Sequence, residues 1–203
     1  IKDQKIKDAP LVDDGRRTST KLRYIAGVQQ VLRADHETDH PLSPKIETKL
    51  TGKVSAAIRG CKAVVLSDYG KGVLSGTTPA KIIKMARKAK KPVIVDPKGA
   101  DFGRYRGADV ITPNRRELAL ATGLETDTAA DVVKAAKRLI RQYRFGAVLV
   151  TLSADGMTLV TAKGAPAQRP DQPAPPLRAA PFAAPPARRA PVPASPPARR
   201  AAP

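Results

Sequence analysis

Cysteine and aromatic residues are scarce in this chain, and tryptophan is absent. The single cysteine, Cys61, excludes an intrachain disulfide and indicates a reducing compartment. We expect its small side chain to be buried just before a strand. Aromatic residues make up 3% of the sequence, so few side chains are available to stack on single-stranded nucleic acid. No apolar run approaches the length of a membrane span and no segment resembles a signal peptide, which favours a cytoplasmic protein without a membrane partner.

Acidic residues are also scarce, because 18 Asp and Glu stand against 37 Lys and Arg, a formal net charge of +19. Such an excess raises nucleic-acid binding as a hypothesis. The shortage of aromatic side chains argues against that partner. A phosphate-rich small molecule is an equally good partner for the positive charge.

Short apolar runs recur along the chain and end in small, polar or charged residues, with helical patterns between them. The runs and their polar ends occupy residues 63–72, 93–99, 110–117 and 148–156. Strands that alternate with helices predict an α/β fold, with a mainly parallel sheet and helices on both faces. Ligands bind outside the carboxyl ends of the strands in such sheets. The polar strand ends therefore predict one site assembled from loops.

Amphipathic patterns and capping residues define the remaining elements. Residues 21–25 alternate between polar and apolar, as a half-buried strand does, and a second strand follows a turn at Gly27. A turn at residues 155–156 leads to an antiparallel strand over residues 157–161. Helices are predicted over residues 43–58, from a cap at Thr78 with Pro79 in the first position, from Asn114 to Gly123, and from Thr126 or Thr128 to Tyr143.

The composition changes abruptly after Lys163. Residues 166–203 are almost entirely Pro, Ala and Arg, and about a third of them are Pro. Such a segment cannot bury enough apolar surface to offset its ordering entropy, so we expect residues 164–203 to form a disordered tail. Pro, Ala and Arg are also what GC-rich codons encode when they are read in a shifted frame. A frameshift near residues 164–170 is therefore a second explanation.

The loop after residue 67 is the first candidate site. Its glycines and Lys71 could cradle an anion beside Asp68, although a tight turn with a solvated lysine explains the same residues. Asp96 and Lys98 follow the next strand, where they could orient a hydroxyl and a phosphate or form a surface ion pair.

Two later segments also carry alternative readings. Asn114 and Glu117 can form a helix-capping box, or lie beside a metal–phosphate group at the helix N-terminus. Residues 151–156 could shape a nucleotide pocket or close a hairpin.

Residues 36–40 match the His-Glu-x-x-His pattern of zinc proteases, but Pro41 disfavours a helix there, so we expect an exposed loop.

Together these segments resemble the ribokinase-like (PfkB) carbohydrate kinases. Among them, the chain is most similar to the D-glycero-β-D-manno-heptose-7-phosphate kinases, which form the N-terminal half of bifunctional heptose kinase/adenylyltransferases. The resemblance covers residues 10–163 in family order. The Asp-Pro-Lys-Gly to Arg-Tyr-Arg-Gly stretch within residues 96–108 is specific to heptose kinases, whereas the Asn-x-x-Glu element is shared across the family. The segments that carry the resemblance are residues 18–23, 29–35, 66–72, 96–108, 112–117 and 150–156.

The resemblance implies ATP-dependent phosphorylation of heptose 7-phosphate at its anomeric hydroxyl, on the route to ADP-heptose and lipopolysaccharide core. ATP and Mg²⁺ are the implied cofactors. Residues 18–35 correspond to lid strands, through which intact family members often form homodimers. The residues implied to border the ATP phosphates and Mg²⁺ are Asn114, Arg115, Arg116 and Glu117, with Glu117 acting indirectly on the metal. The residues implied to lie towards the nucleotide are Thr151, Ser153 and Gly156, and those implied to line the sugar cleft are Asp68, Lys71, Asp96 and Lys98.

The chain departs from the family pattern at both ends. The family's catalytic aspartate lies in a Gly-Ala-Gly-Asp motif, and a Gly-Gly-Ala-Asn segment binds the sugar; neither motif occurs in the 203 residues. We therefore expect an incomplete kinase domain over residues 1–163, without a catalytic aspartate and with little or no activity. The first residue, Ile1, fits a missing upstream part. The alternatives are another PfkB sugar kinase, or a basic binding protein that acts through its tail.

Overall fold

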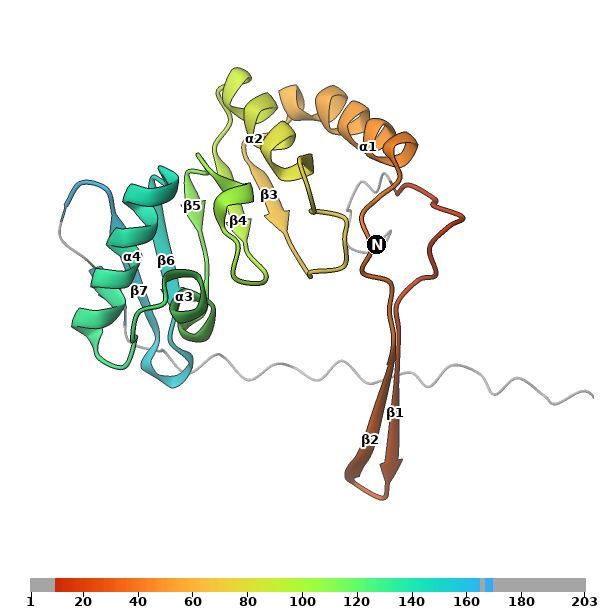
Figure 1. The fold of residues 1–203 in the computed structure, drawn as a ribbon, viewed down its shortest axis with the longest axis horizontal. Coiled ribbons are helices and arrows are strands. Elements are labelled where there is room, and N and C mark those ends of the chain that lie inside the picture. Colours follow the sequence, from red (N-terminus) through yellow and green to blue (C-terminus); the bar gives the residue numbers. More distant parts are fainter. Residues whose placement is uncertain (1–9, 165–166, 170–203) are drawn as a thin grey trace, which may run out of the picture. The chain divides into compact units, whose positions relative to one another are not determined.

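A computed structural model describes residues 10–164 and 167–169, and a six-stranded sheet forms their centre (Figure 1). The strands lie side by side in chain order. They are Val64–Ser67 (β3), Val93–Asp96 (β4), Val110–Ile111 (β5), Ala147–Thr151 (β6), Met157–Thr161 (β7) and Ala167–Arg169 (β8). The α-helices are Pro44–Ala57 (α1), Thr78–Lys88 (α2), Arg115–Thr122 (α3) and Ala129–Tyr143 (α4). Short 3₁₀ turns are Ile58–Gly60 (η2), Gly103–Tyr105 (η3) and Ser153–Asp155 (η4).

Strands β3 to β6 pair in parallel, and β7 and β8 pair antiparallel to their neighbours. The mainly parallel α/β sheet that the sequence predicts is therefore confirmed. The predicted tail, residues 164–203, lies outside the described residues apart from Gly164 and β8, and β8 is a strand that the sequence did not predict. None of the helices in the described part of the chain is long and apolar enough to cross a membrane.

One face of the sheet is buried far more completely than the other. Val93, Val95, Val148 and Val150 are fully buried, and they pack in one apolar cluster with side chains of α2, α3 and α4. On the opposite face Val65 is 63% exposed. Consecutive crossovers along a sheet in one direction place their helices on the same face, which accounts for the asymmetry. The expected second layer of helices is not formed by α2, α3 or α4.

Helix starts follow local hydrogen bonding. Asn114 caps α3 with a capping box, and Thr128 rather than Thr126 does the same for α4. The predicted cap of α2 at Thr78 is wrong, because the helix already includes Thr78 and its N-cap position is Thr77, which makes no side-chain cap. The hydroxyl of Thr78 instead donates to Glu47 of α1 at 3.0 Å. A contact between helices has replaced the local cap.

The segment that was predicted to contain lid strands forms a separate antiparallel hairpin, β1 (Thr20–Ala26) and β2 (Gln29–His36). The first of these strands was expected to be half-buried, but every residue in both strands is exposed. The pairing places apolar Leu22, Tyr24 and Leu32 on one face, and charged residues on the other. The sequence pattern reflects two chemically different faces, and neither face is packed against a second layer in the described chain.

Two further expectations concern single sites. Cys61 is exposed, so the prediction of a buried cysteine is wrong; its thiol contacts the Ala57 carbonyl at the end of α1. The His-Glu-x-x-His segment is not helical, because His36 ends β2 and an irregular stretch follows. The described residues contain no group of three or more His, Cys, Asp or Glu side chains that could hold a metal ion. The irregular course after His36 agrees with the predicted loop, but Glu37 and Thr38 are half-buried and not exposed as predicted.

Gly72 allows the stretch after β2 to approach the loop after β3. It has a φ of +79°, and a Cβ on it would lie 2.0 Å from the His40 carbonyl oxygen. Gly72→Ala should therefore lower the free energy of unfolding through both backbone strain and this clash, by about 1–3 kcal/mol more than strain alone. Urea unfolding followed by circular dichroism would measure the loss.

Gly76→Ala is the matched control, since Gly76 has a φ of +54° and a Cβ added to it would meet nothing within 4 Å. We expect it to cost about 1 kcal/mol from backbone strain alone. Equal losses for the two variants would show that the close approach of His40 has no energetic consequence.

Candidate active site

The polar residues at the ends of β3, β4, β5 and β6 meet at one edge of the sheet. They line a cavity of about 340 Å³ together with the start of α3. The lining residues from these elements are Asp68, Tyr69, Asp96, Pro97, Lys98, Thr112, Asn114, Glu117 and Thr151. Parallel strands place their carboxyl ends together, so residues up to 83 positions apart in sequence contribute to one site.

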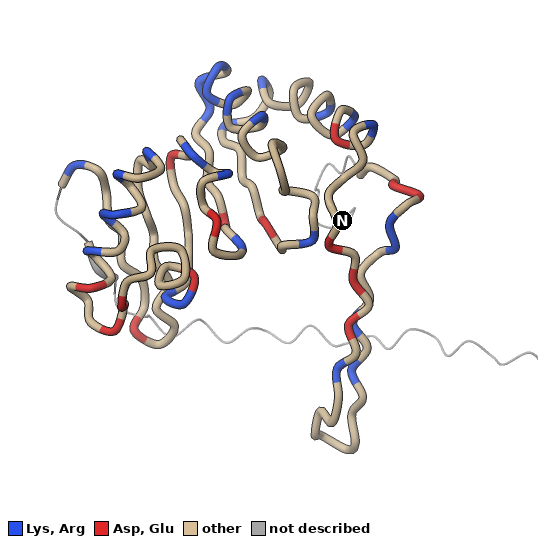
Figure 2. Tube along the Cα trace, viewed as in Figure 1, with Lys and Arg blue, Asp and Glu red and all other residues tan. Residues whose placement is uncertain are grey.

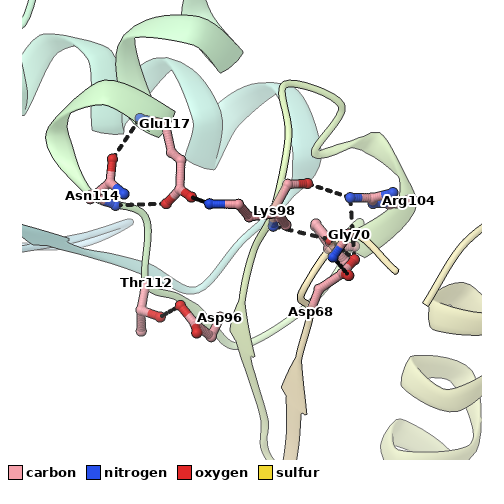
Figure 3. A network of polar contacts seen from close by, with 9 residues as sticks. Asp68, Gly70, Asp96, Lys98, Arg104, Thr112, Asn114 and Glu117 are labelled. Carbon is pink, nitrogen blue, oxygen red and sulfur yellow. Dashed lines mark hydrogen bonds and ion pairs between the residues drawn. The ribbon is translucent and has the colours of Figure 1, made fainter. Parts of the chain in front are cut away.

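Asp68 is the most completely buried carboxylate of this edge, with its side chain 3% exposed (Figure 3). Its Oδ1 accepts a hydrogen bond from the Gly70 backbone at 2.7 Å, and its Oδ2 accepts one from the Tyr105 hydroxyl at 2.5 Å. The Arg104 guanidinium lies 3.2 Å from Oδ2. A buried charge is tolerated when it is paired and hydrogen-bonded in this way. Asp68 is thus held rigidly at the cavity wall.

Burial and the hydrogen bond to Asp68 raise the pKa of Tyr105 above its ordinary value. The ring is fully buried, packs edge-on against Phe102 and lies under the Arg104 guanidinium. The phenol therefore stays protonated and serves as a permanent hydrogen-bond donor to the Asp68 carboxylate.

Lys98 and Glu117 form the second polar contact of the central cavity (Figure 3). The Lys98 ammonium lies 3.0 Å from Oε1 of Glu117, while Oε2 accepts a hydrogen bond from the backbone of Asn114. The Asn114 side chain accepts one from the Glu117 backbone at 2.8 Å and completes the capping box. Asp96 contacts the hydroxyl of Thr112 and not Lys98, so the proposed ion pair between Asp96 and Lys98 is absent.

A second cavity of about 620 Å³ adjoins the central one on the α3 side. Asn114 and Thr151 line both cavities, and their backbones form an isolated parallel bridge. Arg115, Arg116 and Ser153 line only the second cavity, where Arg115 pairs with Asp155 at 2.8 Å. Gly156 lines neither cavity; it is buried, and its carbonyl accepts a hydrogen bond from Leu152 as part of the turn into β7.

A third cavity of about 750 Å³ lies between the loop after β3 and the charged face of the hairpin. Asp68, Tyr69 and Lys98 line this cavity as well as the central one. The hairpin side supplies Lys21, Arg33, Asp35 and Glu37. The three cavities therefore form a row along the carboxyl edge of the sheet.

Glu37 ties the hairpin to the sheet. Its carboxylate pairs with Lys21 of β1 at 2.8 Å and with Lys71 of the loop after β3. Hydrogen bonds from Lys21 and Lys71 lower the pKa of Glu37 to about 2. The Lys71 carbonyl in turn accepts a hydrogen bond from Arg16 at 2.8 Å. Lys71 was predicted to be a charge for phosphate or a solvated lysine in a tight turn, and in the structure it links the hairpin segment to the loop.

Most of the residues singled out from the sequence thus line one row of cavities, with Gly156 as the exception. The sequence pattern indicated no role for Tyr105 or Arg104, and Glu37 stood out only as part of the His-Glu-x-x-His segment. Glu37 could have been found from the strand pattern. It follows Asp35 by two residues, so an extended chain places both side chains on the charged face of the predicted hairpin, where Lys21 also lies. Nothing in the local pattern around Tyr105 indicates that its hydroxyl reaches a residue 37 positions earlier.

The donor set suits a magnesium–phosphate group. Mg²⁺ takes oxygen ligands, keeps several waters and is commonly held by one or two carboxylates plus substrate phosphates. Glu117 supplies a carboxylate at the first turn of α3, and Arg115 and Arg116 lie beside it.

Comparison with known proteins identifies the family. The pfkB family carbohydrate kinase profile matches residues 1–175. The chain belongs to the pfkB carbohydrate kinase family. This finding confirms the resemblance drawn from the polar strand ends.

Curated relatives of this pfkB chain carry the name bifunctional protein HldE. That of Rhodospirillum rubrum is 55% identical over 153 residues, which make up 75% of this chain and 31% of the relative. That of Acidiphilium cryptum is 50% identical over 151 residues, or 74% of this chain and 31% of the relative. The chain spans about a third of the length of these relatives.

Solved structures support the ribokinase-like fold. Arabidopsis thaliana ribokinase, complexed with ribose and ATP, matches with a TM-score of 0.51 and 20% identity, covering 68% of this chain and 44% of that one. Escherichia coli phosphofructokinase-2 in complex with fructose-6-phosphate matches with a TM-score of 0.56 and 19% identity, covering 77% and 52%. At these identities the likeness concerns the fold.

Tyr105→Phe removes the donor to Asp68 while keeping the ring. We expect a loss of about 1–2 kcal/mol in the free energy of unfolding, because a buried carboxylate oxygen loses a hydrogen bond. The raised pKa adds a pH dependence: the unfolded tyrosine ionises near pH 10 while the folded one does not, so wild-type stability falls as the pH rises above about 10. Urea titrations at pH 8 and at pH 10.5 would measure both effects.

Tyr143→Phe is the control for this substitution, since the Tyr143 hydroxyl contacts only the exposed Gln142 among the hydrogen bonds of the described residues. It should change stability by less than about 0.5 kcal/mol and leave the alkaline loss intact. The assignment would fail if Tyr105→Phe kept the same stability difference between the two pH values as the wild type.

Proposed function

We propose that this chain carries the nucleotide and sugar-phosphate binding surface of an ATP-dependent D-glycero-β-D-manno-heptose-7-phosphate kinase. The observation that carries the proposal is the row of three adjoining cavities along the carboxyl edge of the sheet. A kinase must hold two phosphorylated molecules in line, and these cavities meet at shared residues. The similarity to proteins named HldE supports the heptose assignment.

The cavity beside α3 suits the nucleotide. Arg115 and Arg116 provide positive charge for phosphates, the N-terminus of α3 adds the positive end of its helix dipole, and Thr151 and Ser153 provide hydroxyls. Glu117 would hold Mg²⁺ indirectly, and bound Mg²⁺ would neutralise charge on the transferred phosphoryl group. Phosphoryl transfer depends mostly on such positioning and charge neutralisation, which this inventory provides.

The cavity beneath the hairpin suits the sugar phosphate. Lys21, Arg33 and Lys71 provide positive charge there, and Asp35 and Glu37 provide acceptors for hydroxyl groups. Asp68 and Lys98 lie where this cavity meets the central one, so both face the region between the two substrates. ATP and sugar phosphates are cytoplasmic metabolites, so we infer a cytoplasmic location.

Transfer itself is a separate matter from binding. The 203 residues contain no Gly-Ala-Gly-Asp motif, which carries the catalytic aspartate in the family. We therefore propose that the chain as it stands binds both substrates but turns them over poorly.

Purified chain should bind a magnesium complex of a non-hydrolysable ATP analogue and heptose 7-phosphate, measured by isothermal titration calorimetry. Glu117→Gln should weaken nucleotide binding in magnesium by about ten-fold or more, because the carboxylate charge is lost. Glutamine can still complete the capping box, so the fold should persist. Fructose 6-phosphate in place of heptose 7-phosphate tests whether the site belongs to another sugar kinase of the family.

Glu125→Gln is the matched control, since Glu125 is exposed outside the cavities and should leave nucleotide affinity unchanged. Binding of fructose 6-phosphate in preference to the heptose would contradict the substrate assignment. Robust heptose-dependent ATP turnover by the same preparation would contradict the expectation of low activity.

The apolar face of the hairpin supports self-association, the second property implied by the family. Leu22, Tyr24 and Leu32 share that face, and each is more than half exposed. We expect Leu32→Glu to raise the dimer dissociation constant by about ten-fold or more, because it buries a charge in the interface. Sedimentation velocity over a concentration series measures this constant.

Leu120→Glu, on an exposed face of α3, is the control and should not change the association. A wild-type chain that stays monomeric at every concentration would contradict the proposal.

A further inference from the structure

Lys98 occupies an unusual place between two binding regions. It lines the cavity beneath the hairpin and the central cavity, and its side chain is 55% exposed. Its ammonium nevertheless lies on the Glu117 carboxylate at 3.0 Å (Figure 3). A lysine in this position can reach either region by turning its side chain alone.

The backbone of Lys98 is held in place on both sides. Its carbonyl accepts a hydrogen bond from Arg104, and the Tyr105 hydroxyl lies 3.5 Å from its backbone nitrogen. Arg104 and Tyr105 are the same residues that hold Asp68. On the other side Gly70 approaches closely, since a Cβ on it would lie 3.1 Å from Cγ of Lys98. The base of the lysine is thus fixed, and only its distal atoms are free to move.

Both oxygens of Glu117 are already engaged, but by bonds of different kinds. Oε2 accepts the backbone hydrogen bond that completes the capping box of α3. Oε1 is held by Lys98, whose side chain is 55% exposed, so water screens the pair on its lysine side, although the Glu117 side chain is only 12% exposed. A divalent cation that approaches Glu117 will therefore displace Lys98 before it disturbs the helix cap.

We propose that Lys98 is an exchangeable counter-ion of Glu117. Its ammonium neutralises the carboxylate while no metal is bound. It then gives up that place when a magnesium–nucleotide complex arrives. This inference rests on the proposed function, because it takes the α3 cavity as the nucleotide site.

The exchange predicts that Lys98 and magnesium oppose one another. Without metal, loss of the Lys98 ammonium leaves the Glu117 carboxylate as an unneutralised negative charge beside the phosphates. With metal bound, Mg²⁺ neutralises that carboxylate even when the ammonium is lost. Lys98→Met should therefore weaken binding of the ATP analogue more in EDTA than in saturating Mg²⁺. The dissociation constant in EDTA divided by the dissociation constant in saturating Mg²⁺ should therefore be about two- to five-fold higher for Lys98→Met than for the wild type.

A double-mutant cycle tests the residue through which Lys98 acts. In a Glu117→Gln background, Lys98→Met should no longer change the ratio, because the shared carboxylate is gone. Lys98→Arg keeps the charge and should restore a ratio close to wild type. Lys81→Met is the matched control, since Lys81 forms an ion pair with Glu47 at 2.8 Å and is similarly exposed at 53%, but lies on α2 away from the cavities.

The possible results distinguish failure of the Lys98 inference from failure of the proposed function. A purely structural role for Lys98 would weaken binding equally in both conditions, so an unchanged or lower ratio for Lys98→Met overturns the inference while leaving the proposed function intact. A rise that persists in the Glu117→Gln background also overturns it. If the wild-type chain bound no nucleotide in either condition, the proposed function and this inference would both fall.

Discussion

The parallel pairing of β3 to β6 is the constraint on which the site depends. Each strand is only two to five residues long, yet its register with the next strand delivers a polar loop to the same edge. Burial of Val93, Val95 and Val148 against the helices holds that register, since a slip of one residue would turn these side chains to the other face. The chemistry at the edge is thus positioned by the apolar core beneath it.

Charge at this edge is balanced within the protein. The chain has a net charge of +19, and Lys and Arg positions are spread along the helices, loops and hairpin (Figure 2). At this edge of the sheet three of these cations pair with specific carboxylates. Lys71 lies on Glu37, Lys98 on Glu117 and Arg104 on Asp68. The first two pairs involve partly exposed lysines, so they can be exchanged for a phosphate or a metal at little cost, whereas the buried Asp68 pair serves to fix geometry. The site therefore combines a rigid wall with movable charges.

Local signals in the sequence carried much of this description. Apolar runs located the strands. The spacing of Asn114 and Glu117 predicted a capping box, and the structure contains both of its hydrogen bonds. The errors arose where a long-range contact competes with a local one: Thr78 contacts Glu47 instead of capping α2, and the hairpin strands alternate in polarity without being buried. The binding roles proposed for the cavity residues stay predictions, because they depend on ligands and not on the fold alone.

The sequence by itself determined the alternation of strands and helices, the family, and the polar residues at each strand end, because these depend on periodicity and short motifs. Only the tertiary structure decided which of those residues meet. Tyr105 reaches Asp68, and Lys98 reaches Glu117 and not Asp96, because strand order and loop path set distances that no local pattern encodes. The hairpin contact through Glu37 was decided in the same way, by two segments 34 residues apart folding against each other.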